Sequence, residues 1–239
     1  MKFTVITIAY NEENSIAETV QSVLKQDYKN LEYLVIDGNS SDSTVVIAGE
    51  LAKKSKRDMR IYSESDFGIY NAMNRGIARA SGDYVIFMNA GDSFCDNGVI
   101  SSVAKRINKC GDAIYYGQAY LMKNGKCTGI NSNLSEHGLL KYNSLMKGRM
   151  PIHQSIAAPL SSLKKHYFNE EYKIRADYDW LLRCCKEGMK FINLDFVVCK
   201  YDSTGVSARA KYKKCMKKET KLIRKRNFPV LGRIYEMLD

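Results

Sequence analysis

Side chains that can hold a polar ligand follow three short apolar runs of this 239-residue chain. Tyr10-Asn11-Glu12 comes directly after a run that ends at Ala9, and Asp37 closes a second run. A third run ends in Asn89-Ala90-Gly91-Asp92. Open α/β sheets bind ligands at the carboxyl ends of their strands, so these residues are candidates for one shared site.

The sequence around these runs predicts strand-helix-strand crossovers. Residues 2–9 and 32–37 are apolar and rich in β-branched side chains, which indicates two strands. Residues 14–26 carry apolar side chains at helical spacing, with Asn14 or Ser15 as the expected N-cap. Such alternation is typical of a parallel sheet covered by helices.

The same α/β pattern continues along the chain, more weakly beyond residue 131. Further helices are predicted at 43–54, between Gly68 and Gly82, at 96–108 and at 176–187. Further strands are predicted at 60–64, at 84–88, at 152–158, near 191–201, and in a hairpin of residues 112–122 and 126–130.

Composition excludes several classes of protein. Hydrophobic residues make up 45% of the chain and there are only three prolines, which indicates a globular protein. The apolar runs are strand-sized, so no transmembrane helix is expected. A strand is predicted almost directly after Met1, which leaves no secretory signal and favours the cytoplasm. Seven cysteines without Cys-x-x-Cys spacing favour reduced thiols over disulfides or a zinc site.

Positive charge is concentrated in residues 209–226. This stretch holds ten Lys or Arg side chains and one acid, Glu219, a net charge of +9 out of +11 for the whole chain. If helical, it is a basic amphipathic segment suited to an anionic membrane surface. The alternative is a solvated basic helix without a partner. We expect its removal to leave the folded body intact.

The N-terminal motifs resemble the opening of the family 2 nucleotide-sugar glycosyltransferases. That family shows a strand followed by Tyr-Asn-Glu, a helix with Ser-x-x-x-Gln, and a second strand ending in Asp-Asp-Gly-Ser-Thr-Asp. The matching residues here are Tyr10-Asn11-Glu12, Ser22 and Gln26, and the run from Asp37 to Asp42. The likeness continues at residues 65–76, 87–92, 151–155 and 176–183, so that it covers about residues 3–207.

This resemblance implies an α/β protein with a GT-A fold. The fold is a Rossmann-like, mostly parallel central sheet flanked by helices, to which this chain adds a basic C-terminal helical tail. We expect a glycosyltransferase domain at residues 1–207, with nucleotide-sugar binding at about 1–95 and an acceptor-binding, catalytic half at about 96–207. The basic tail is expected at residues 208–239.

The resemblance also implies roles for individual residues on the donor side. Asp37 corresponds to the acid that accepts from the nucleobase N–H, although a residue at this position can also simply cap the next helix. Asp92 corresponds to a ligand of Mg²⁺ or Mn²⁺, in a group where the family usually has more carboxylates. The full set of expected donor-binding residues is Ala9, Tyr10, Glu12, Asp37, Asp66, Asn74, Arg75, Asn89 and Ser207.

On the acceptor side, Asp177 corresponds to the family's catalytic base, and Asp179 is the alternative base. An Asp in the first turn of a helix is also favoured there by the helix dipole. His153 is expected to contact the acceptor or the diphosphate, or else to be structural. The processive Gln-x-x-Arg-Trp signature is missing, because Trp180 follows Asp179 and is the only tryptophan.

These implications lead to one expected function and one main alternative. The expected function is the inverting, non-processive transfer of one sugar from a nucleotide-sugar, with UDP-sugars favoured, to a hydroxyl of a glycan or lipid-linked glycan in bacterial surface polysaccharide biosynthesis. The enzyme would be peripheral at the inner face of the cytoplasmic membrane. The main alternative is a catalytically inactive sugar-nucleotide-binding protein. Nucleic acid is not an expected partner despite the basic charge, because no nucleic-acid-binding motif is found.

Overall fold

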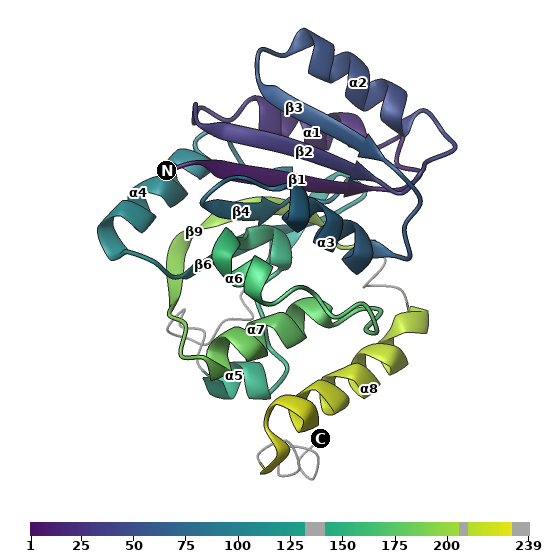
Figure 1. Ribbon diagram of the computed structural model, residues 1–239. Helices are drawn as coiled ribbons and strands as arrows, with labels where there is room; N and C mark the ends of the chain where they lie inside the picture. The colour runs from purple at the N-terminus through teal and green to yellow at the C-terminus, as the bar shows by residue number, and fades with distance from the viewer. Residues whose placement is uncertain (132–141, 206–209, 231–239) are drawn as a thin grey trace.

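The computed structural model describes residues 1–131, 142–205 and 210–230 (Figure 1). Within these ranges a nine-stranded mixed sheet runs in the order β3-β2-β1-β4-β8-β6-β9-β5, with β7 paired to β6. Its strands are β1 Phe3–Ala9, β2 Leu31–Asp37, β3 Asp58–Ser63, β4 Tyr84–Phe87, β5 Ser93–Phe94, β6 Ile114–Lys123, β7 Lys126–Ile130, β8 Ile156–Pro159 and β9 Phe191–Asp202.

Helices cover both faces of this sheet. They are α1 Ile16–Leu24, α2 Thr44–Lys54, α3 Ile69–Arg79, α4 Val99–Cys110, α5 Tyr142–Met146, α6 Leu160–Lys165, α7 Ala176–Lys186 and α8 Ala210–Asn227, together with the 3-10 turn η1 His153–Ser155. Helices α1, α2 and α4 pack on one face, and α3, α5, α6, α7 and α8 pack on the other. The core therefore consists of two apolar layers separated by the sheet.

The N-terminal half of the sheet is parallel, as predicted. Strand β1 lies between β2 and β4 and pairs with both in parallel register, and β2 continues in parallel to β3. All seven residues of β1 are buried, which fits a central strand covered on both faces. Parallel pairing brings the carboxyl ends of β1, β2 and β4 to the same edge, where the predicted site residues follow.

The C-terminal half differs in detail from the sequence prediction. The strand expected at 152–158 begins as the turn η1, and the strands expected near 191–201 form one strand, β9, bent at Asp195, where φ is +62°. Strand β5 and helices α5 and α6 were not predicted. Each is six residues or shorter, too short to show a clear hydrophobic period.

The basic segment is helix α8, and it packs against α7 (Figure 1). Ile223 is fully buried in the same apolar layer as α7, and Glu219, Thr220, Arg224 and Asn227 are buried with it. Removing residues from 209 onward would therefore expose part of the core, and the expectation that the body keeps its fold without them stays a prediction. The expected domain limit at residue 207 falls outside the described residues.

Candidate active site

The loops that follow β1 and β2 are joined by hydrogen bonds. The Asn11 N–H donates to Ser40 Oγ at 2.8 Å, and the Ser41 N–H donates to Asn11 Oδ1 at 2.9 Å. The Glu12 N–H donates to Thr44 Oγ1 at 2.7 Å. Asn11 has φ of +54°, in the left-handed region that Asn tolerates better than most residues. The conformation of each loop is thus fixed by the other.

Asp37 lies at the centre of this junction and is fully buried. Its carboxylate accepts from the Ser40 N–H at 2.9 Å, from the Ser40 hydroxyl at 2.5 Å and from the Ser63 hydroxyl at 2.6 Å. A carboxylate offers about four acceptor positions. Three hydrogen bonds to protein groups therefore leave one position, and the side chain orders the loop after β2 whatever else it binds.

The side chains of Tyr10 and Asp66 lie close to the backbone of Gly38. A Cβ placed on Gly38 would lie 2.8 Å from Asp66 Oδ2 and 3.2 Å from the Tyr10 ring, so a larger residue here would displace the Asp66 side chain. The Gly38 N–H donates to the Ala9 carbonyl at 2.9 Å. Tyr10 is 63% exposed, so its ring faces solvent beside this junction. The structure thus brings the predicted residues Ala9, Tyr10, Asp37 and Asp66 together.

Glu12, Asn74 and Arg75, which were assigned to the donor, contact protein groups. The Glu12 carboxylate accepts from the Ser15 hydroxyl at the start of α1. Asn74 exchanges two hydrogen bonds of 2.9 Å with the backbone of Phe168, and its amide also donates to Glu170. Arg75 donates to the Glu64 carbonyl at 2.9 Å. Asn74 and Arg75 therefore hold the loops before α7 and before α3. Ser207 lies outside the described residues.

A polar chain joins the end of β4 to the start of α7. Asn89 Nδ2 lies 2.9 Å from His153 Nε2, and His153 Nδ1 lies 3.5 Å from Asp177 Oδ2. With a ring proton on Nδ1, Nε2 can accept from the Asn89 amide while Nδ1 lies on the side of Asp177. Three predicted residues, distant in sequence, thus lie in one chain of polar contacts.

The environment of Asp177 favours the ionised carboxylate. Burial alone would raise the pKa of Asp177, but His153, Arg175 and the Tyr178 N–H together bring this pKa below its usual value. The Tyr70 hydroxyl donates to Asp177 Oδ1 at 3.2 Å. Burial and the nearby Asp177 raise the pKa of Tyr70 well above its usual value, so Tyr70 keeps its proton. Asp177 is therefore a charged acceptor at neutral pH.

Asp179 faces a different part of the molecule. Its carboxylate accepts from Arg183 Nε at 2.8 Å and from Asn227 Nδ2 of α8 at 2.9 Å, and the residue is 6% exposed. Both of its oxygens are thus used in packing α7 against α8. The two aspartates in the first turn of α7 therefore contact different parts of the molecule.

Asp92 is buried at the turn after β4. One carboxylate oxygen accepts from the Asp202 N–H at 2.8 Å and the other accepts from the Gln154 side-chain amide. Burial raises the pKa of Asp92 to about 7, although the Asp202 N–H, His153 and Gln154 act in the lowering direction. This carboxyl group therefore changes charge near neutral pH.

The surroundings of Asp92 supply few metal ligands. The described residues contain no group of three or more His, Cys, Asp or Glu side chains placed to hold a metal ion. Asn89 Oδ1 and Gln154 Oε1, however, are buried and have no hydrogen-bond partner among the described residues. Together with Asp92 these oxygens fit a Mg²⁺ or Mn²⁺ ion that takes its remaining ligands from water and phosphate.

Sequence reasoning gave no role to two residues that contact the predicted ones. Tyr70 lies within the motif at 65–76, so a signal was present for it. Asp202, whose N–H holds Asp92, gave no signal because a backbone donor can come from any residue type.

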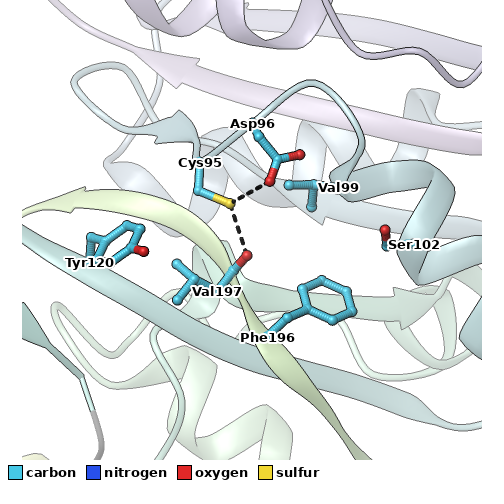
Figure 2. Close-up of a pocket in the computed structure, with 7 residues that line it drawn as sticks. All are labelled: Cys95, Asp96, Val99, Ser102, Tyr120, Phe196 and Val197. Atoms are coloured by element: carbon cyan, nitrogen blue, oxygen red, sulfur yellow. Dashed lines mark hydrogen bonds between the residues drawn. The ribbon is translucent and has the colours of Figure 1, made fainter.

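A separate pocket lies between β5, the start of α4, β6 and β9 (Figure 2). The Cys95 thiol contacts the Val197 carbonyl at 2.9 Å and the Asp96 carboxylate at 3.5 Å. Burial, followed by Asp96, raises the pKa of Cys95 to about 12, so this cysteine stays protonated and unreactive. None of the predicted site residues is among the seven that line this pocket.

The raised pKa of Asp92 predicts a pH-dependent stability. The folded state keeps the Asp92 proton up to about pH 7, whereas the unfolded state loses it near the ordinary value of 3.8, so stability falls as pH rises between these values. The slope from this group is about 1.4 kcal/mol per pH unit. Urea unfolding at pH 5 and pH 7 in EDTA should show a smaller loss of stability for Asp92→Asn than for wild type. The exposed Asp96→Asn should keep the wild-type difference, and equal differences in all three proteins would contradict the assignment.

Comparison with known proteins shows which family the chain belongs to. The model of glycosyl transferase family 2 matches residues 4–168. The amylovoran biosynthesis glycosyltransferase AmsB of Erwinia amylovora is 28% identical over 207 residues, which cover 80% of this chain and 66% of that protein. The chain thus spans about two thirds of the length of this relative.

Two solved structures share the fold. S. aureus TarS 1–349 in complex with UDP-GlcNAc has a TM-score of 0.73 at 19% identity, covering 94% of this chain and 67% of that one. Glucosyl-3-phosphoglycerate synthase from Mycobacterium tuberculosis, in complex with Mn²⁺, UDP and glucosyl-3-phosphoglycerate, has a TM-score of 0.62 at 16% identity, covering 95% and 79%. The predicted GT-A type sheet with flanking helices is confirmed. The chain belongs to glycosyl transferase family 2.

Proposed function

We propose that this protein transfers one sugar from a nucleotide-sugar, with UDP-sugars favoured, to a hydroxyl of a glycan or lipid-linked glycan in bacterial surface polysaccharide biosynthesis. Membership of family 2 and the names of the relatives support this proposal. The observation that carries it is the chain Asp177–His153–Asn89, which links an ionised carboxylate to the strand end where the family binds its donor.

The donor end of the proposed site is the junction of the loops after β1 and β2. Tyr10 offers an exposed ring on which a base can lie, and Asp37 has one acceptor position left for a base N–H. Because Asp37 is fully buried, neighbouring side chains must move before a nucleobase can reach this carboxylate. Uracil fits this arrangement, since it presents an N–H beside its carbonyl groups.

The cation end is Asp92 with the unpartnered oxygens of Asn89 and Gln154. A bound Mg²⁺ or Mn²⁺ ion would neutralise charge on the departing diphosphate. Asp92 must be ionised to serve such an ion, and its pKa of about 7 would make cation binding stronger as the pH rises through neutrality.

In the proposed reaction, Asp177 accepts the proton of the acceptor hydroxyl while the oxygen bonds to the anomeric carbon. The bond from that carbon to the diphosphate breaks in the same step, so the configuration inverts. His153 and Tyr70 hold the carboxylate in place through its two oxygens. We assign the base to Asp177 rather than Asp179, because Asp177 lies beside His153 and the end of β4, whereas Asp179 contacts Arg183 and Asn227 of α8.

One observation favours the inactive alternative. Both oxygens of Asp92 already accept hydrogen bonds from protein groups, and Gly91 contributes no carboxylate beside it. A protein of this kind would bind UDP but would not release UDP from a sugar donor. Measuring UDP release from UDP-sugars in the presence of Mn²⁺ separates the two functions.

The outer face of α8 supports contact with an anionic membrane surface, where lipid-linked acceptors lie. Lys213, Lys214, Lys217 and Lys218 are exposed, while Ile223 anchors the helix in the core. None of the described helices is both long and apolar enough to cross a membrane. Attachment through this face would be peripheral and sensitive to salt.

Replacing the proposed base should separate binding from turnover. Asp177→Asn should bind UDP with an affinity close to that of wild type and lose about 10² to 10⁴ in turnover, the usual contribution of a general base. Asp179→Asn is the comparison in the same helical turn, and its loss of turnover should be much smaller, because Asp179 acts only through the packing of α7 against α8. UDP-release kinetics and calorimetry measure both quantities. Full turnover by Asp177→Asn would reject Asp177 as the base.

Neutralising the lysine face should weaken membrane binding without unfolding the protein. Each lysine near an anionic leaflet contributes about 1 kcal/mol. Changing Lys213, Lys214, Lys217 and Lys218 to Gln should therefore lower binding to phosphatidylserine vesicles at least about tenfold at low salt. The control carries the same change at four exposed lysines of α2 and α4, namely Lys53, Lys54, Lys105 and Lys109. Equal loss in both variants, or no vesicle binding by wild type, would contradict the assignment of this face.

A further inference from the structure

Helix α8 has a second, buried face that contacts the start of α7. Glu219 and Asn227 lie on this face two turns apart, and both are 8% exposed. A carboxylate is rarely buried in a protein without several hydrogen-bond partners. The contacts of Glu219 therefore indicate what this face does.

The Glu219 carboxylate accepts three backbone hydrogen bonds from the residues that precede α7. The N–H groups of Lys173, Ile174 and Arg175 donate to it at 2.8, 3.1 and 3.1 Å. The N-cap residue of α7, Arg175, makes no capping hydrogen bond with its own side chain. Glu219 thus binds, from another helix, the backbone segment that leads into α7, including the N–H of its N-cap residue, and its negative charge is favourable there.

Arg175 strengthens the same connection. Its Nε donates to Thr220 Oγ1 of α8 at 3.1 Å, and its Nη2 donates to the Gly148 carbonyl at 3.0 Å. Its guanidinium group lies 4.9 Å from the centre of the Tyr178 ring. One turn further along α7, Asn227 donates to Asp179. Helix α8 therefore holds the first turn of α7 on both sides of Asp177.

We infer that Glu219 is a positioning residue for the catalytic base, which it orients by fixing the backbone that carries Asp177. This inference rests on the proposed function only in the assignment of Asp177 as base. Asp177 follows the capped segment by two residues, and its contacts with His153 and Tyr70 are 3.5 and 3.2 Å long. A small shift of the first turn of α7 would break these contacts.

Glu219→Gln is the informative variant. A Gln side chain has the same shape, but one of the two acceptor oxygens becomes an NH₂ donor, which would face either the Lys173 N–H or the N–H groups of Ile174 and Arg175. We expect kcat for UDP release to fall about 10- to 100-fold, as is typical of a misplaced catalytic group. The KM for the nucleotide-sugar should stay within about twofold, because the donor junction of β1 and β2 is not involved. A variant whose kcat equals that of wild type would overturn the inference, and so would one that changes only KM.

Glu171→Gln is the matched control. This glutamate also contacts α8, through Arg226 at 3.1 Å, but its side chain is 71% exposed. It should keep wild-type kcat and KM. A loss in Glu171→Gln as large as that in Glu219→Gln would overturn the inference, because any weakened contact with α8 would then suffice.

Hydrogen exchange on the wild-type protein tests the contact without a variant and without activity. The amides of Lys173, Ile174 and Arg175 should exchange as slowly as those inside α7. Exchange as fast as in exposed loops would overturn the inference, even if Glu219→Gln failed to fold. If the amides are protected and wild type releases no UDP from any nucleotide-sugar, the contact stands and the proposed function is what has failed.

Discussion

The position of β1 between two parallel neighbours is the constraint on which the rest of the site depends. Parallel pairing places Ala9 opposite Asp37, so the loops that leave β1 and β2 begin at the same level of the sheet. The two loops then satisfy one another's backbone groups through Asn11, Ser40 and Ser41. A shift of β1 by one residue would invert its side chains and separate these loops. The donor junction is therefore a consequence of sheet register.

The second half of the site depends on contacts between distant elements. Asn89 follows β4, His153 belongs to a short turn, and Asp177 lies in the first turn of α7, so the chain of polar contacts among them exists only in the folded protein. Helix α8 extends this arrangement, because its buried face holds the helix that carries Asp177 while its outer face carries exposed lysines. One helix thus links a candidate membrane surface to the candidate base.

Sequence reasoning predicted the elements whose signal is local. The parallel strands and the helices between them have long apolar patterns, and the polar residues at their ends could be identified before the structure was known. Side-chain partners were much harder to predict. Asn74 and Phe168 lie 94 positions apart, so nothing near Asn74 indicated that its amide holds a loop. Asp177 and Asp179 differ by about 200° around the helix axis, and the sequence did not show which of them faces the site.

The packing of the basic segment was also hard to predict from the sequence. Its composition predicted a helix with a charged face, but the buried Ile223 and Glu219 stand among lysines and gave little indication of a docked helix. Only the surroundings in the folded chain distinguish a lysine-rich helix that packs against the body from a solvated tail.

A calorimetric titration of UDP tests most directly whether the strand ends of β1 and β2 bind the uridine diphosphate part of the donor. Wild type should bind UDP saturably in Mg²⁺. Asp37→Ala, which loses a charged hydrogen bond worth about 1.5 to 3 kcal/mol, should bind at least about tenfold more weakly. Ser63→Ala, which removes a contact of Asp37 but leaves its carboxylate, should bind nearly as well as wild type. Equal affinity in Asp37→Ala, or no saturable binding of UDP by wild type, would contradict this account.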